Sequence, residues 1–383
     1  MVLADVAVVH QRRTVELIDA AASRALAQWR RVDFADLDRS WVEVGPRIVA
    51  VAEDAQRRTA NAAGSYAAAA EKAQGVDSAG VRVNGEAVVG VDGSGRSVDT
   101  LLQGSIVSTK RAVAAGVGAN EAMIAGAAYL VSMMKTALAD VARSSDVVAS
   151  AGKGFTDYVR VIQAGACQRC AILAGIRSSK DAFERHPGCR CMAAPTFGER
   201  PEGFFATPEE YFDSLSEAEQ DRVFTRGGAE AIRSGARVST VVSARRGATG
   251  ISYSNRLNSR VGRGPWRRME RVTVGFRPDG SAIQVFTTTE GTTARGVFGR
   301  NAATTRVGSD RYSTANRIRL MPESIVELTD DVDLRKVLLR DAGYLDYPIQ
   351  NYSSNEWVQE HRVIRSNERR IADDFYRSLG VTL

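Results

Sequence analysis

Several residue types and patterns are scarce in this chain of 383 residues, and each scarcity excludes a class of protein. The longest stretch without a charged residue that we find, residues 122–134, has thirteen residues. A membrane-spanning helix needs about 20 apolar residues, so we expect no transmembrane helix. The N-terminal residues lack the succession of basic, apolar and small residues that marks a secretory signal. We therefore expect a protein that matures in a cytoplasm.

Histidine is also scarce, with three residues in the whole chain, and this limits the catalysis that we expect. A serine or cysteine hydrolase needs a histidine that takes the proton of its nucleophile. We expect His10 and His361 to face solvent, and His186 lies among cysteines. The sequence contains neither the G-x-S-x-G elbow of serine hydrolases nor the H-E-x-x-H pattern of zinc peptidases. It therefore predicts a non-enzymatic protein.

The four cysteines all fall between residues 167 and 191, and in a reducing compartment such clustering favours a metal over a disulfide. Cys167 and Cys170 form a C-x2-C pair, and His186, Cys189 and Cys191 form H-x2-C-x-C. Two loops that each supply two ligands can complete the tetrahedron of a structural zinc ion. The predicted ligands are Cys167, Cys170, His186 and either Cys189 or Cys191. Two other interpretations stay open: buried cysteines without a metal, and a disulfide or redox pair.

Composition and patterning predict an α+β protein. The chain is 44% hydrophobic and 25% charged, as is usual for folded proteins, and its length allows two or three domains. We expect a mainly helical N-terminal region with a Gly-rich connection (residues 1–118), a small α+β core with the Cys/His knuckle (119–243), an Arg-rich loop and β-hairpin segment (244–320) and a helical C-terminal tail (321–383).

Local signals predict particular elements within these segments. Residues 2–73 have helical periodicity, with a second helix starting at Pro46, whereas the Gly-rich residues 75–104 suggest a strand pair or loop. Helix is expected to resume at Asn120, and residues 155–162 suggest a strand. Further on, the sequence predicts a helix from Pro208, a capping box of Ser216 and Glu219, a break at Gly227-Gly228, a short helix over 229–234, and a hairpin that turns at Pro278-Asp279-Gly280.

Positive charge is concentrated in one segment. Residues 244–320 contain fifteen arginines and four acidic residues, a net charge of +11, whereas residues 1–150 have a net charge of −1. Part of this stretch surrounds Trp266 with basic residues, namely Arg256, Arg260, Arg263, Arg267 and Arg268. Such a stretch could bind DNA without reading its sequence. It could equally bind an acidic partner protein or be a solvated loop.

Two stretches around the cysteines carry a family resemblance. They are residues 158–175, which contain Cys167 and Cys170, and residues 186–191, which contain the H-x2-C-x-C pattern. Together they resemble the MuF-like minor head proteins of tailed bacteriophages. The shared motif of that family is C-x2-C followed by H-x-x-C-x-C. The blocks at residues 211–220, 229–235 and 241–247 look like the form found in phages of actinobacteria. The resemblance covers roughly residues 120–345.

This resemblance implies a minor capsid protein, also called a head morphogenesis protein, that is present in the virion. It implies a place in the head interior near the portal, after assembly in the host cytoplasm, with the portal protein and the major capsid or scaffold protein as partners and no membrane. Packaged DNA would be within reach of the Arg-rich segment. Some relatives are described as capsid maturation proteases, so cleavage of scaffold or major capsid protein is the alternative function. A third possibility is a host-directed effector released with the genome.

Overall fold

The computed structural model describes residues 2–77, 80–162, 166–186, 188–248, 252–253, 267–268, 271–293, 295–302, 304–306, 313–346 and 355–381. The fold is α+β, as predicted, with a helical N-terminal region, small antiparallel sheets and a helical C-terminal part. The chain forms two compact units, which are described separately. The N-terminal unit contains residues 1–166 and 173–207, and the C-terminal unit contains residues 167–172, 208–253 and 267–383.

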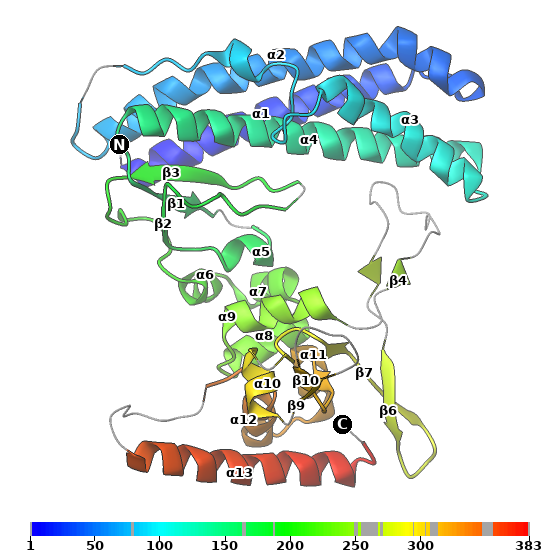
Figure 1. The fold of residues 1–383 in the computed structure, drawn as a ribbon, viewed down its shortest axis with the longest axis vertical. Coiled ribbons are helices and arrows are strands. Elements are labelled where there is room, and N and C mark those ends of the chain that lie inside the picture. Colours follow the sequence, from blue (N-terminus) through cyan, green and yellow to red (C-terminus); the bar gives the residue numbers. More distant parts are fainter. Residues whose placement is uncertain are drawn as a thin grey trace. The chain divides into compact units, whose positions relative to one another are not determined.

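Four long helices make up most of the N-terminal unit. They are α1 (Leu3–Trp29), α2 (Leu37–Lys72), α3 (Val98–Ala114) and α4 (Ala119–Gly152), and they run side by side (Figure 1). Small residues let them approach closely. A Cβ atom at Gly126 on α4 would lie 2.5 Å from the ring of Trp29 on α1. Since α4 packs with the three preceding helices, the structure does not divide at residue 118, where the sequence suggested a boundary.

Two helices differ from the sequence prediction. Helix α2 begins at Leu37, where the Asp36 carboxylate accepts a hydrogen bond from the backbone N–H of Arg39, and Pro46 lies inside the helix. Helix α3 occupies part of the segment expected to be strand or loop. Gly104 within it faces the ring of Tyr129, where a Cβ atom would lie only 2.5 Å from the hydroxyl oxygen. This glycine serves close packing and does not break the helix.

Asp92 organises the turn that leads into α3. Its carboxylate accepts hydrogen bonds from the backbone N–H groups of Ser94 (2.8 Å) and Arg96 (3.0 Å), and it forms an ion pair with the Arg96 guanidinium at 2.7 Å. Burial by itself would raise the pKa of Asp92, but these hydrogen bonds outweigh burial and lower the pKa to about 2.

Asp92→Asn is expected to lower the free energy of unfolding at pH 7 by about 1 kcal/mol, because the amide loses the charge-assisted bonds. A lowered pKa in the folded state stabilises the fold above the unfolded pKa of about 4, and this contribution disappears as pH falls toward 2. Urea unfolding between pH 7 and pH 3 should therefore show the two proteins converging at low pH. The exposed Asp77→Asn is the control. A difference that stays constant with pH would contradict this account.

A three-stranded antiparallel sheet lies in the same unit, with strand order β2-β1-β3. Its strands are β1 (Asp157–Val161), β2 (Ile176–Ser178) and β3 (Met192–Thr196), and β1 confirms the strand expected over residues 155–162. Side chains from α2 and its C-terminal end cover the outer edge of β3. The Tyr66 hydroxyl donates to the carbonyl of Ala193 at 2.8 Å, and the Gln74 amide donates to the carbonyl of Pro195 at 3.0 Å. These bonds satisfy carbonyl groups that point away from β1.

The C-terminal unit is built from short helices and small strand pairs, with one long helix at its end. Its helices are α5 (Gln168–Ala171), α6 (Pro208–Asp213), α7 (Glu217–Phe224), α8 (Arg226–Arg233), α9 (Val238–Ala244), α10 (Val297–Asn301), α11 (Pro322–Leu328), α12 (Val332–Asp341) and α13 (Asn355–Ser378). Its strand pairs are β4 (Ser252–Tyr253) with β5 (Arg267–Arg268), β6 (Val272–Phe276) with β7 (Ala282–Val285), β8 (Thr287–Thr288) with β11 (Arg319–Leu320), and β9 (Thr304–Arg306) with β10 (Ser313–Ala315).

Local signals in this unit were mostly interpreted correctly. The capping box is present, since the backbone N–H of Ser216 donates to the Glu219 carboxylate at 3.0 Å, and β6 and β7 form the predicted hairpin. The predicted break at Gly227-Gly228 is wrong, because α8 runs through both glycines. The chain reverses earlier, at Thr225, which has a φ of 68° and whose hydroxyl accepts the N–H of Gly228.

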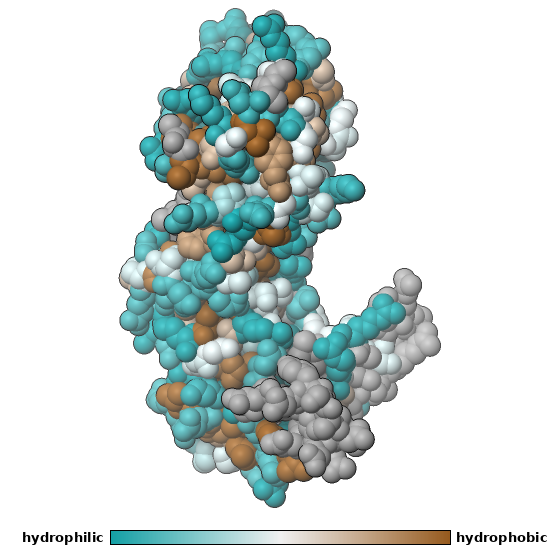
Figure 2. Space-filling model, turned by 90° about the vertical axis from the view of Figure 1, so that its left-hand side faces the viewer, coloured by the Kyte–Doolittle hydropathy of each residue, from teal (hydrophilic) through white to brown (hydrophobic). Residues whose placement is uncertain are grey.

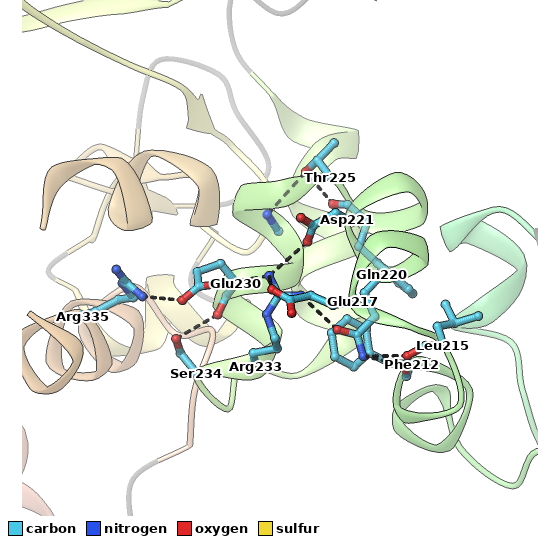
Figure 3. A network of polar contacts seen from close by, with 12 residues as sticks. Phe212, Leu215, Glu217, Gln220, Asp221, Thr225, Glu230, Arg233, Ser234 and Arg335 are labelled. Carbon is cyan, nitrogen blue, oxygen red and sulfur yellow. Dashed lines mark hydrogen bonds and ion pairs between the residues drawn. The ribbon is translucent and has the colours of Figure 1, made fainter. Parts of the chain in front are cut away.

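Two arginines join three elements of this unit (Figure 3). The Arg233 guanidinium at the end of α8 donates to the Gln220 amide oxygen and to the Asp221 carboxylate of α7, each at 3.0 Å. Glu230 on α8 in turn accepts from Arg335 on α12 at 2.8 Å. The polar residues of α7 and α8 therefore face each other, and the Glu230 carboxylate links α8 to α12.

By length and composition alone, α4 could cross a membrane, because its most apolar window of eighteen residues has a mean hydropathy of 1.4. Of that window, 39% is buried inside the protein, and the core helix of a soluble protein meets the same criteria. Here α4 packs against α1, α2 and α3. Figure 2 shows one face of the molecule, on which hydrophilic side chains are interspersed with separate apolar groups.

Candidate metal centre

Two tight turns present the cysteines and the histidine. In the first, the backbone N–H of Cys170 donates to the carbonyl of Cys167 at 2.9 Å, at the start of α5. In the second, the backbone N–H of Cys189 donates to the carbonyl of His186 at 3.0 Å. The C-x2-C and H-x2-C spacings thus fold into the same kind of turn, which holds the two side chains of each pair near each other.

The side chains of these turns form one cluster of potential metal ligands. The ligand atoms of Cys167, Cys170 and His186 lie within 4.8 Å of one another, and so do those of Cys170, Cys189 and Cys191. Cys170 belongs to both groups. It is buried, as are Cys189 and Cys191, while the other two residues are partly exposed. All five candidates named from the sequence are therefore brought together, and the cluster could hold a metal ion.

The donor atoms fit a tetrahedral metal better than a disulfide. The Sγ atoms of Cys167 and Cys170 are 3.6 Å apart, whereas a disulfide bond measures about 2.05 Å. Zinc–sulfur bonds of about 2.3 Å in a tetrahedron place neighbouring sulfur atoms about 3.8 Å apart. The other two cysteines are likewise not disulfide-bonded. Both Cys189 and Cys191 lie in the cluster with Cys170, so the sulfur atoms can supply more than the three ligands that the sequence analysis assigned to them.

Polar side chains of the helices hold the segment that carries Cys189 and Cys191. The buried Arg143 on α4 donates to both of their carbonyl groups, at 3.2 and 3.3 Å, and Gln11 on α1 donates to the carbonyl of Arg190 between them at 2.9 Å. Sequence reasoning did not identify Arg143 or Gln11. Nothing local in the sequence marks either residue, because the carbonyl groups that they satisfy belong to a distant segment.

Comparison with known proteins was made for the whole chain. No family model, curated protein or solved structure matches it. Function is therefore inferred from the sequence and the geometry of the cluster.

His10 does not face solvent, and that expectation is wrong. It is buried on α1, with Nε2 3.0 Å from a carboxylate oxygen of Asp146 on α4, and its ring stacks on Tyr66 at 3.8 Å between centroids. Burial raises the pKa of Asp146, and it raises that of Tyr66 well above its usual value. The apolar stripe of α1 passes through position 10, which explains the burial. The side chain of His361 lies outside the described residues.

The predicted DNA-binding arginines are not tested by the structure. Arg256, Arg260 and Arg263 lie outside the described residues, and Arg267 and Arg268 are described only as the backbone of β5.

Other arginines of residues 244–320 have partners inside the protein. Arg245 pairs with Glu323, Arg271 with Glu327 at 2.7 Å, and Arg317 with Asp341 at 3.0 Å. Arg319 is buried, and its guanidinium lies 4.1 Å from the centre of the Tyr344 ring. Part of the +11 charge of this segment therefore stabilises the C-terminal unit.

Proposed function

We propose that this chain is a non-enzymatic structural protein whose Cys/His cluster holds a zinc ion. The observation that carries this proposal is the convergence of two similar turns on one set of sulfur and imidazole ligands. Cys167, Cys170, Cys189, Cys191 and His186 would supply the ligands, and the filled site would leave no position for a reacting water molecule. The ion would contribute stability, since metal bound only by the folded chain adds its binding free energy to folding.

We further propose that the protein is a minor capsid protein of a tailed bacteriophage that associates with the portal inside the head. The support is that the residues which carry the resemblance to MuF-like head proteins, C-x2-C and H-x2-C-x-C, are the same residues that gather in the cluster. Residues that share a motif because they bind the same metal ion are expected to gather in this way. DNA contact through the Arg-rich segment stays a prediction.

Co-assembly tests this role. The chain is co-expressed with the scaffold and major capsid proteins of its phage, with and without the portal protein, and procapsids are purified by sedimentation. We expect it to sediment with procapsids that contain the portal and to be absent from procapsids without it. Equal amounts in both, or none in either, would contradict the portal association. Intact-mass measurement of the scaffold and major capsid proteins in the same samples tests the protease alternative, which requires them to be shortened.

A further inference from the structure

Positive charge is buried beside the cluster without enough negative charge to balance it. Arg143 on α4 and Arg160 on β1 are only 6% and 4% exposed, and the partly exposed Arg185 lies in the same group. Asp140 accepts from Arg143 and from Arg185, each at 2.6 Å, but no ion pair of Arg160 is found among the described residues. Asp146, almost two turns further along α4, is paired with the imidazole described above.

Arg160 is the least satisfied of these cations. One of its terminal nitrogens donates to the carbonyl of Glu184 at 2.5 Å, and the guanidinium lies 3.9 Å from the centre of the Phe183 ring. Its Nε and its other terminal nitrogen are buried and have no hydrogen-bond partner in the part of the chain that the structure describes. A buried cation in this state destabilises the folded protein unless an anion lies close by.

Two of the cysteines lie close to these arginines and could become anionic. Arg143 donates to the carbonyl groups of Cys189 and Cys191 themselves. Arg160 lies directly opposite Ala193 in the β1–β3 pair. Cys191 is two residues before Ala193, so it lies diagonally across from Arg160 on the same face, at about 7–8 Å. Arg143 therefore contacts the segment that carries these two sulfur atoms, and Arg160 lies on the same face of the sheet as Cys191.

We propose that Arg143 and Arg160 are positioning residues that supply the countercharge of a metal–thiolate centre. This inference rests on the proposed zinc site. Zinc bound by three thiolates and a histidine carries a net charge of −1, and zinc bound by four thiolates carries −2. Neutral thiols or a disulfide carry none and would leave Arg160 without a countercharge and Arg143 with only the carboxylate that it shares with Arg185. Arg143 also fixes the backbone of the ligand segment, as outer-shell partners do in other metal sites.

Three variants test this proposal: Arg160→Met, which removes the charge, Arg160→Lys, which keeps it, and Arg12→Met, a control on the exposed face of α1. Affinity is measured by competition between the protein and a zinc chelator, and ligand geometry by the absorption bands of Co²⁺ in the site. We expect Arg160→Met to weaken zinc binding about tenfold or more, Arg160→Lys to weaken it less, and Arg12→Met to bind as the original protein does.

The melting temperature supplies a readout that a purely structural role would not give. Without metal, Arg160→Met should melt at or above the temperature of the original protein, because an uncompensated charge has been removed. With zinc, it should melt below the original. Equal destabilisation in both forms with unchanged zinc affinity would overturn the countercharge role. If the original protein binds neither Zn²⁺ nor Co²⁺, the zinc proposal fails, and this inference fails with it.

Discussion

Replacing Cys170 by serine is expected to abolish zinc binding and to lower the stability of the protein to that of its metal-free form. Cys170 belongs to both groups of ligand atoms, so its loss breaks each of them. A ligand present at 1,000 times its dissociation constant stabilises a folded protein by about 4 kcal/mol, and this contribution would disappear. Native mass spectrometry gives the metal content, and thermal unfolding with and without a chelator gives the loss of stability.

Single Cys189→Ser and Cys191→Ser variants extend this experiment to the ligand set. If one of these cysteines is outside the zinc tetrahedron, its variant should retain one zinc ion per chain, and the other variant should not. Ser378→Ala, at the exposed end of α13, is a suitable control. The zinc site would be refuted if the original protein, purified without chelators, contained no metal and had the same melting temperature in their presence.

Glu71→Gln is expected to destabilise the N-terminal unit by about 3–5 kcal/mol, because it leaves a buried ammonium group without its carboxylate. The Nζ atom of Lys153, the residue that follows α4, lies 2.5 Å from Oε2 of Glu71 in the last turn of α2. The side chains are 1% and 3% exposed, so water cannot replace the lost partner. Urea-induced unfolding monitored by circular dichroism measures the effect.

The double variant Glu71→Leu with Lys153→Met distinguishes the effect of the ion pair on stability from the effect of the packing around it. Removing both charges leaves no unpaired ion, and we expect it to recover most of the stability lost in the single variant. An exposed pair provides the comparison: Glu43→Gln, which breaks the contact with Arg39 on the surface of α2, should change stability by less than 0.5 kcal/mol. A loss of less than 1 kcal/mol in Glu71→Gln would contradict the importance of the buried pair.

Elements with local signals were predictable from the sequence. The box formed by Ser216 and Glu219 starts α7, and the turn through Asp279 and Gly280 joins β6 to β7, because in both places neighbouring residues satisfy one another. Helix α3 was missed because Gly104 is a helix-breaking residue by propensity. Its reason for being in the helix is the ring of Tyr129 on α4, which only the tertiary structure brings close.

The candidate site likewise has a part that was predictable from the sequence and a part that was not. Its ligands were predictable, since a metal imposes a spacing on residues that are close in sequence. Arg143 and Gln11 were not, because the carbonyl groups that they satisfy belong to a segment 46 or more residues away. The partner of the buried His10 is likewise distant, since Asp146 lies 136 residues away. Long-range polar contacts of this kind leave no periodic pattern in the sequence.

The covered edge of β3 limits how this sheet can recruit other chains. An exposed edge strand can accept a strand from another protein through main-chain hydrogen bonds, a common mode of peptide recognition. At β3 the carbonyl groups of Ala193 and Pro195 are already occupied by Tyr66 and Gln74, and proline has no N–H to offer. A partner that extended this sheet by β-augmentation would have to do so along β2.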